Sequence, residues 1–387
     1  MRDSGSVIPD HIDGAAVRAH AALDRRALLW GVLAASMSAC SSPRHLIGVT
    51  PEDSVNGGAP PARTHRIFIA TTRALSSEPG EFFSGDRSLT LNYASVDVRV
   101  PPGHVIGQAE RPRRLPPDPE KHFIFEDPKT YDLVGFQAAA EVALRPVPRR
   151  DRKLLIWVHG YNSTLTDAAL RLAQFVEDTG YDGIPLLFSW ASAGKLTSYV
   201  YDINSALMAR DAINWLGAAL ARSSFESIDV VAHSMGNFLV LEAIRGAANA
   251  NLFDTSGKLK TVVLADPDID YELFVTQVAA LPPEKRRFYV LVSNDDRALA
   301  LSSFLSRRPR VGNIDPEALT KLGVNVIDLS LVKDTSSSNH SKFVDAPEIV
   351  QLIGDRIVAG DNRTSSANSG VGEALIIGAG GVLGVLD

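Results

Sequence analysis

Alternating strand-like and helix-like segments from Lys153 onward constrain the fold more than any other feature of the chain. The strand-like segments, such as LLIWVHG and IPLLFSW, are continuous apolar runs. The segments between them, such as LTDAALRLAQFVEDTG, carry apolar residues at helical spacing. Strands that are apolar on both faces need cover on both faces, which the connecting helices of a parallel sheet provide. The sequence therefore predicts an α/β domain over residues 151–360, with a mostly parallel sheet and helices on both faces.

The amino-terminal residues have the features of an export signal. The stretch DRRALLWGVLAASMSAC places two arginines, a short apolar run and small residues directly before Cys40, the one cysteine of the chain. This is the order of a signal peptide, and the apolar run is too short to cross a bilayer as a helix. We expect residues 1–40 to be the signal and residues 41–63, rich in Ser, Pro and Gly, to form a flexible tether.

The segment MSAC resembles a bacterial lipoprotein box, in which cleavage leaves a lipid-bearing cysteine at the new amino terminus. Met37 stands where leucine is more usual. The adjacent DRRALL resembles a twin-arginine export signal. A chance arginine pair and a buried free cysteine are the alternative. We expect an exported protein that faces the periplasm and is held at the membrane through lipidated Cys40.

Two further segments flank the α/β domain. The runs RIFIATTR and LTLNYASVDVRV predict strands, so we expect residues 64–150 to form a β-rich amino-terminal extension. Near the other end, IIGAGGVLG resembles the G-x-G-x-x-G pattern of dinucleotide-binding proteins, but Leu383 occupies the position of the third glycine. We expect residues 361–387 to be a flexible, glycine-rich apolar tail without a nucleotide site.

Composition excludes several classes of protein. Apolar residues make up 45% of the chain and charged residues 22%, close to soluble globular averages, which disfavours disorder and a polytopic membrane protein. The net charge of −6 comes from interspersed acidic and basic residues, so no broad basic face is available for nucleic acid. This charge distribution is compatible with small-molecule or lipid substrates. The composition does not indicate an oligomeric state.

The segment VVAHSMGNFLV places Ser234 between an apolar strand and a helix. A serine in a sharp strand-to-helix turn needs small residues two positions before and after it, and here they are Ala232 and Gly236. Such a turn holds the serine hydroxyl out as a nucleophile. The alternative is a serine that only begins a helix. Its position midway along the α/β domain favours the nucleophile.

A serine nucleophile needs a histidine base that is oriented by a carboxylate, and on this architecture the chain order is Ser, Asp or Glu, His. His233 is adjacent to the serine and poorly placed as a base, whereas His340 lies in a polar loop after the strand VNVIDLS. The preceding strand ends in LVSNDDRAL. Of its two carboxylates we choose Asp296 as the acid, with Asp295 as the alternative.

The negative charge that develops on a substrate carbonyl oxygen needs fixed hydrogen-bond donors. One is the backbone N–H of Met235, directly after the nucleophile. The segment VHGYNST supplies the second, since Gly160 permits a sharp turn and Tyr161 offers its amide. We expect His159 to support this loop, and a packed structural histidine is the alternative.

The segment DPDID could suggest a calcium loop, but the sequence argues against one. The sixth position is Tyr271 instead of glycine, and the twelfth is Gln277 instead of glutamate. We therefore expect neither a metal nor a cofactor.

The chain resembles the bacterial α/β-hydrolase family known as "domain of unknown function 900" from about Arg66 to Arg356. The resemblance implies an α/β-hydrolase fold and serine hydrolase chemistry, and it favours Asp296 because the family's acid precedes a basic residue, here Arg297. Ala191 stands where the family usually has proline, and Lys342 where an aromatic residue is common. The motifs that carry the resemblance are FIATTR, LNYASVDVRVPPGH, DPEKHF, VHGYNST, GYDGIPLLFSW, AHSMGN, DPDID, SNDDRAL and NHSKF.

These observations predict a serine hydrolase that cleaves small-molecule or lipid carboxylic esters through an acyl-enzyme on Ser234. An amidase, thioesterase, acyltransferase or phospholipase would use the same triad. A non-catalytic binding protein of the cell envelope is the alternative from another class. The segment ASAGKLTSYVYD, which follows Trp190, is the expected lid over the acyl pocket.

Overall fold

A computed structural model describes most of the chain. The predicted signal with Cys40 lies outside the described residues, as do much of the predicted tether and much of the predicted tail. No helix among the described residues is long and apolar enough to cross a membrane. The described ranges are 43–49, 63–332, 340–359, 375–378 and 381–385.

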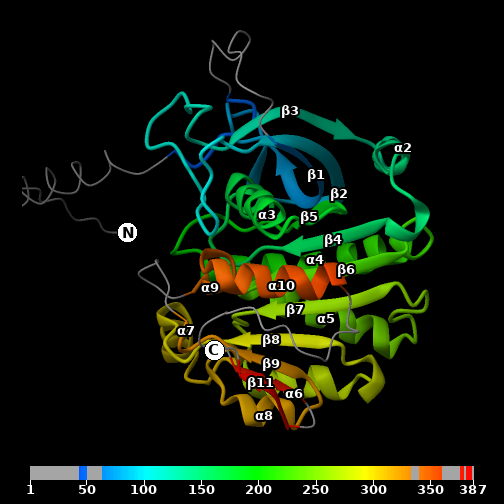
Figure 1. Ribbon diagram of the computed structural model, residues 1–387, viewed down its shortest axis with the longest axis vertical. Coiled ribbons are helices and arrows are strands. Elements are labelled where there is room, and N and C mark those ends of the chain that lie inside the picture. The colour runs from blue at the N-terminus through cyan, green and yellow to red at the C-terminus, as the bar shows by residue number, and fades with distance from the viewer. Residues whose placement is uncertain (1–42, 50–62, 333–339, 360–374, 379–380, 386–387) are drawn as a thin grey trace, which may run out of the picture. The chain divides into compact units, whose positions relative to one another are not determined.

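The described strands form one mixed sheet in the order β11-β10-β9-β8-β7-β6-β4-β5-β1-β2-β3 (Figure 1). Neighbouring strands are parallel from β1 through β5, β4, β6, β7 and β8 to β9, and antiparallel at both edges. The strands are β1 (Thr64–Leu75), β2 (Phe83–Arg99), β3 (Ile124–Tyr131), β4 (Lys153–Val158), β5 (Ile184–Ser189), β6 (Ser227–His233), β7 (Leu259–Ala265), β8 (Phe288–Val292), β9 (Asn325–Asp328), β10 (Leu375–Gly378) and β11 (Gly381–Val385).

Helices cover both faces of this sheet. Alternate residues of β4 show why, since Leu155 and Trp157 enter one apolar core and Leu154 and Ile156 the other. Helices α3 and α10 pack in the first core, and α4, α5 and α6 in the second (Figure 1). The α/β-hydrolase fold expected from the sequence is confirmed. The helices are α2 (Leu133–Leu144), α3 (Leu165–Thr179), α4 (Tyr199–Ala221), α5 (Met235–Asn249), α6 (Tyr271–Ala279), α7 (Arg297–Ser306), α8 (Pro316–Thr320), α9 (Lys342–Asp345) and α10 (Pro347–Ala359).

Local sequence sets the bounds of α3. Thr164 and Asp167 form a capping box at its start, in which each side chain accepts a hydrogen bond from the other residue's backbone N–H. Gly180 follows its end with φ +63°, a left-handed conformation that glycine adopts without a steric penalty. The helix therefore begins and ends where residues satisfy its otherwise unpaired backbone groups.

The strands assigned to an amino-terminal extension belong to the main sheet. Strand β1 pairs in parallel with β5, with Phe68 opposite Leu186, and β2 and β3 continue the sheet outward. Residues 43–49 are also packed, because Leu46 and Ile47 are buried in the first core. This differs from a flexible tether over 41–63.

The carboxyl-terminal segment departs from the prediction in a similar way. Within the stretch expected to be a flexible tail, β10 pairs antiparallel with β9, and β11 pairs with β10. An edge strand exposes unpaired backbone N–H and C=O groups, which another β-prone segment can satisfy. Strand β10 covers the edge of β9 in this manner, and β11 in turn covers the edge of β10.

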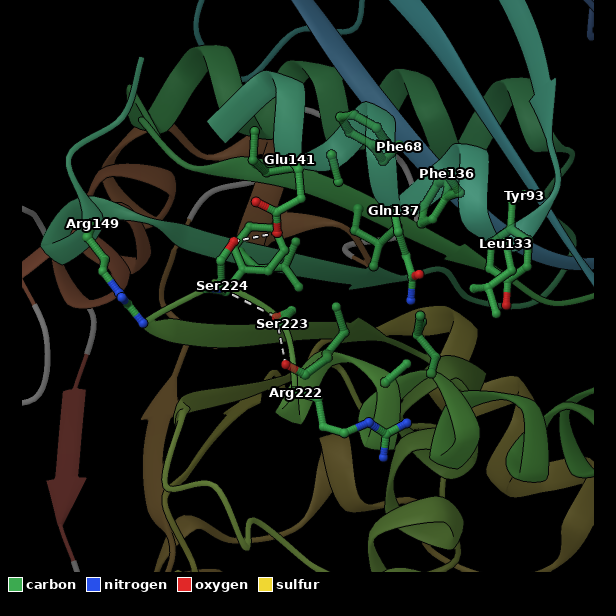
Figure 2. A pocket seen from close by; sticks show the side chains of 18 residues that line it. Phe68, Tyr93, Leu133, Phe136, Gln137, Glu141, Arg149, Arg222, Ser223 and Ser224 are labelled. Atoms are coloured by element: carbon green, nitrogen blue, oxygen red, sulfur yellow. Dashed lines mark hydrogen bonds between the residues drawn. The ribbon is translucent and has the colours of Figure 1, made fainter. Parts of the chain in front are cut away.

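The parallel strands place the loops that follow them at one end of the sheet, the carboxyl end of the strands, as an α/β architecture requires. The loops after β4, β6, β8 and β9 contain His159, Ser234, Asp296 and His340. A cavity of about 540 Å³ lies elsewhere, beside the amino ends of β4 and β5, lined by α2, α4 and residues 222–225 (Figure 2). That cavity is at the opposite end of the strands from Ser234.

Candidate active site

Ser234 lies in a strained turn between β6 and α5. Its φ of +52° and ψ of −120° are rare for a residue with a side chain. A Cβ at Gly236 would come within 2.5 Å of the His159 carbonyl oxygen, and a Cβ at Gly160 within 2.9 Å of the Ser234 Cβ. Both positions therefore need glycine. Ala232, the small residue on the strand side, is fully buried in β6.

His340 and Asp296 form a short hydrogen bond. The His340 Nδ1–H donates to Asp296 Oδ2 over 2.6 Å. In the neutral ring, Nε2 is therefore the nitrogen that can accept a proton. The Asp296 side chain is 0% exposed, and that of His340 is 17% exposed. Asp296 is also the N-cap of α7, where Oδ1 accepts from the Leu299 N–H at 3.0 Å. The helix cap thus orients the carboxylate toward the imidazole.

The surroundings of His340 favour its protonated form. Burial lowers the pKa of His340, but the hydrogen bond to Asp296 and the negative charges of Asp296, Asp266 and Asp268 outweigh burial. The net result is a raised pKa. An imidazolium that forms during proton transfer would therefore be stabilised.

Asp295 has a different partner. Lys342, whose side chain is 0% exposed, donates from Nζ to Asp295 Oδ1 at 2.6 Å and to the Leu329 carbonyl oxygen at 2.9 Å. Ser293 Oγ donates to the same carboxylate oxygen at 2.6 Å. The two adjacent aspartates thus hold different residues, Asp296 the loop residue His340 and Asp295 the first residue of α9, Lys342. Lys342 is thus buried within this ion pair.

His233 connects the predicted nucleophile and the predicted base, because it precedes Ser234 in the chain and bonds to His340. His233 donates from Nε2 to the His340 carbonyl oxygen at 3.0 Å, and the two rings lie 4.8 Å apart. Among the residues that the structure describes, no hydrogen bond joins Ser234 Oγ to His340. Catalytic hydrogen bonds are often long without substrate and tighten in the complex.

The two predicted amide donors lie on adjacent segments. Met235 is the first residue of α5, so its N–H has no acceptor inside the helix and lies at the positive end of the helix dipole. Tyr161 follows β4 in the turn that packs on the serine, as the close approach of Gly160 to Ser234 shows. The Tyr161 hydroxyl donates to the Leu196 carbonyl oxygen in the segment expected to be a lid.

A buried arginine holds the donor loop, and the sequence reasoning missed its role. Arg73, only 1% exposed, donates to the carbonyl oxygens of Ser163 at 2.7 Å and Ser192 at 2.8 Å, and to Ser189 Oγ at 2.8 Å. Burial lowers the pKa of Arg73 to about 10, so it stays charged at neutral pH. The signal in the sequence was an arginine that ends the apolar strand run FIATTR.

His159 is packed beneath the same loop. Its Nδ1–H donates to the Gly160 carbonyl oxygen at 2.8 Å, Ser189 Oγ donates to Nε2 at 3.0 Å, and the ring stacks on Trp190 at 4.9 Å. Burial, followed by the charge of Arg73, lowers the pKa of His159 to about 3. His159 is therefore neutral and cannot act as a cationic group.

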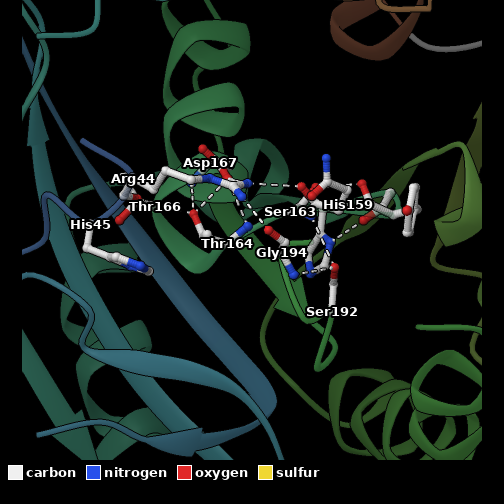
Figure 3. A network of polar contacts seen from close by, with 12 residues as sticks. Arg44, His45, His159, Ser163, Thr164, Thr166, Asp167, Ser192 and Gly194 are labelled. Carbon is white, nitrogen blue, oxygen red and sulfur yellow. Dashed lines mark hydrogen bonds and ion pairs between the residues drawn. The ribbon is translucent and has the colours of Figure 1, made fainter. Parts of the chain in front are cut away.

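A polar network continues behind this loop (Figure 3). Arg44 donates to Asp167 Oδ2 at 2.9 Å, to the Asn162 carbonyl oxygen at 3.2 Å and to the Gly194 carbonyl oxygen. Asp167 also belongs to the capping box with Thr164 at the start of α3. The donor loop and the expected lid are thus tied to the same arginine.

The carboxylates of DPDID have structural partners of their own. Asp270 caps α6 by accepting from the Leu273 N–H at 3.1 Å. Asp268 accepts from Tyr199 OH at 2.9 Å and Ser302 Oγ at 2.6 Å. Asp266 is fully buried and lies close to the two histidines of the site.

A strained serine after a parallel strand, followed along the chain by an aspartate and a histidine that bond to each other, defines the α/β hydrolases. The chain belongs to the family of α/β hydrolases of unknown function, DUF900, whose profile matches residues 137–356, more than half of its length. Membership of this family supports a hydrolase. No curated protein matches the chain.

Several solved esterases have similar structures at low identity. One from the fungus Rhizomucor miehei is 13% identical with a TM-score of 0.34, covering 87% of this chain and 90% of its own. An esterase from Pyrobaculum calidifontis is 11% identical with a TM-score of 0.35, covering 88% and 95%. Esterase B from Lactobacillus rhamnosis is 11% identical with a TM-score of 0.35, covering 87% and 95%. At these values the likeness carries no argument about substrate.

Proposed function

We propose that this protein is a serine hydrolase that cleaves carboxylic esters through an acyl-enzyme on Ser234. The observation that carries the proposal is the hydrogen bond between His340 and Asp296. It lies at the carboxyl end of the parallel strands, where Ser234 occupies its strained turn. A serine hydroxyl is a weak nucleophile at neutral pH, and a histidine held by a carboxylate is the usual means of activating it.

In the proposed reaction, His340 Nε2 takes the proton of Ser234 as Oγ attacks the ester carbonyl carbon. The resulting oxyanion accepts hydrogen bonds from the N–H groups of Tyr161 and Met235. His340 then gives its proton to the leaving alkoxide, which departs as the alcohol. Water then attacks the acyl carbon as His340 takes its proton, and collapse of the tetrahedral intermediate releases the carboxylic acid while His340 returns that proton to Ser234 Oγ. Asp296 holds the imidazole and stabilises its cationic form throughout.

The segment after Trp190 is the proposed lid. Its Leu196 and Val200 are 76% and 71% exposed, although both are large apolar side chains. Leu196 adjoins the donor loop through its hydrogen bond with Tyr161. An acyl chain bound at Ser234 would contact these side chains and remove them from water, which favours esters with a substantial apolar acyl group.

The test is hydrolysis of p-nitrophenyl esters of increasing acyl length by the wild type and by Ser234→Ala. The proposal expects hydrolysis by the wild type and a loss of at least about 1000-fold in Ser234→Ala. Parallel assays with amides, thioesters, phospholipid vesicles and added acceptor alcohols distinguish the related chemistries that share this triad. Activity confined to amides or thioesters would contradict the ester assignment.

We also propose that the protein is exported, with Arg25 and Arg26 forming a twin-arginine signal, and that it is lipidated on Cys40. The support is the order of arginines, apolar run and small residues before the one cysteine. Cells labelled with a radioactive fatty acid test this directly. The wild type should carry label in the membrane fraction and Cys40→Ala should not, whereas label in both would contradict modification at Cys40.

A further inference from the structure

We infer that His233, Asp266 and His340 form a binding site for a divalent transition-metal ion such as Zn²⁺, which inhibits the enzyme reversibly when bound. The inhibition rests on the proposed function, because the ion would occupy the nitrogen that accepts the Ser234 proton. The binding itself does not depend on that function.

The three side chains converge from separate parts of the chain. His233 ends β6, Asp266 follows β7, and His340 lies between β9 and α9. Each offers one ligand atom, and these three atoms lie within 4.8 Å of one another. Ligands bound to tetrahedral Zn²⁺ at 2.0–2.1 Å are about 3.3 Å apart, so side-chain rotations that close the gaps by about 1.5 Å would complete the site.

The donor set suits zinc better than the common alkaline-earth ions. Two imidazoles and one carboxylate are a typical set for catalytic Zn²⁺, whereas Ca²⁺ and Mg²⁺ prefer six or more oxygen ligands. The three protein ligands would leave a fourth position for water.

Hydrogen bonds already orient both imidazoles as in metal sites, where the second ring nitrogen donates to a protein oxygen. His340 donates from Nδ1 to Asp296 at 2.6 Å, so Nε2 is the nitrogen that offers a lone pair when the ring is neutral. His233 donates from Nε2 to the His340 carbonyl oxygen at 3.0 Å.

The backbone beneath the site is held in place. Asp266 has φ +45°, a rare value for a residue with a side chain, and its N–H donates to the Leu291 carbonyl oxygen at 3.2 Å. The Ser234 N–H donates to the Ala265 carbonyl oxygen at 3.0 Å, so the turn of Asp266 adjoins the turn of the nucleophile. A fixed backbone reduces the entropy lost when an ion orders these side chains.

Titration calorimetry with ZnCl₂ on the full chain, freed of metal by a chelator, measures the binding. It is performed on Ser234→Ala, which retains all three proposed ligands. We expect one site, and we expect Asp266→Asn or His233→Asn, each added to Ser234→Ala, to weaken binding by about tenfold or more. Asp229→Asn is the matched control, because Asp229 is a buried aspartate at the other end of β6. Its affinity should be unchanged, and MgCl₂ should give no binding.

Co²⁺ provides a readout that does not depend on variants. The wild type should give the visible absorption of a four- or five-coordinate Co²⁺ with nitrogen ligands, and Zn²⁺ should displace it. Absence of Zn²⁺ binding, or binding that neither Asp266→Asn nor His233→Asn weakens, would overturn the inference. If Zn²⁺ binds as expected but the wild type hydrolyses no ester, the proposed function fails and the metal site stands.

Discussion

His340 Nδ1 lies 2.6 Å from Asp296 Oδ2, although the two residues are 44 positions apart in the sequence. The loop after β9 and the cap of α7 create this contact. Both follow parallel strands, whose carboxyl ends lie at the same end of the sheet. The proposed chemistry depends on this contact because it orients the base that Ser234 needs.

Asp296→Asn should lower kcat for ester hydrolysis by about 1000-fold or more, since an amide can neither hold the required tautomer nor stabilise the imidazolium. Asparagine is a good N-cap, so α7 should keep its start. Asp295→Asn is the matched control and should lower kcat by less than about tenfold, because Asp295 bonds to Lys342. Steady-state kinetics on a p-nitrophenyl ester measure both. The reverse ranking would make Asp295 the acid.

Lys342→Met should lower the free energy of unfolding by about 1–3 kcal/mol, because it leaves Asp295 and the Leu329 carbonyl oxygen without their buried donor. Lys121→Met is the control. Lys121 pairs with Asp118 at the surface with 72% of its side chain exposed, and its loss should change stability by less than about 0.5 kcal/mol. Urea unfolding followed by circular dichroism gives both values. Equal effects would contradict a structural role for Lys342.

The pH dependence of kcat/KM should respond to Asp266. The base must be neutral in the free enzyme, so kcat/KM rises as pH increases through the pKa of His340. Burial lowers that pKa, but the hydrogen bond to Asp296 and the carboxylate charges of Asp296, Asp266 and Asp268 raise it. The ring of His233 also lies beside the ring of His340, and the Asp295–Lys342 pair lies next to its loop. Removing the charge of Asp266 should therefore lower the pKa of His340.

Asp266→Asn should consequently move the acid limb of the profile to lower pH. Asp229→Asn serves as the control and should leave the limb in place. A pH series of kcat/KM on one neutral ester checks both variants. An acid limb that moves to higher pH in Asp266→Asn, or does not move, would contradict this account of the site.

His104 should make the fold less stable at high pH. Burial lowers the pKa of His104, but hydrogen bonds to Asp178 and Glu110 outweigh burial and raise it from 6.5 to about 9. A raised pKa contributes stability that is fully present below pH 6.5 and is lost as pH rises through about 9. The wild type should lose on the order of 2 kcal/mol more than His104→Gln between pH 6 and pH 9.5. Unfolding titrations at both values test this, and parallel losses would contradict it.

Much of the fold and the centre of the site could be predicted from the sequence. The apolar strand runs and the capped, amphipathic α3 carry their structure in local patterns, and the turn at Ser234 has the small neighbours it requires. Chain order then led to His340 and Asp296, which the structure brings together. Their roles in catalysis stay predictions until activity is measured.

The supporting contacts could not be predicted in this way, because they join distant segments. Arg73 meets Ser189 across 116 positions, and Arg44 meets Asn162 across 118. An arginine inside a strand-like run does not indicate which oxygen atoms will accept its hydrogen bonds. The pairing of Lys342 with Asp295 was hidden for the same reason, since an ion pair depends on tertiary geometry.

Labelling by a fluorophosphonate probe shows directly whether Ser234 is a nucleophile, since the probe forms a covalent bond only with an activated serine. We expect labelling of the wild type, with mass spectrometry placing the adduct on Ser234, and no labelling of Ser234→Ala. His340→Ala should be labelled far more slowly, because its serine lacks a base. A folded wild type that the probe does not label, or an adduct on another serine, would rule out Ser234 as the nucleophile.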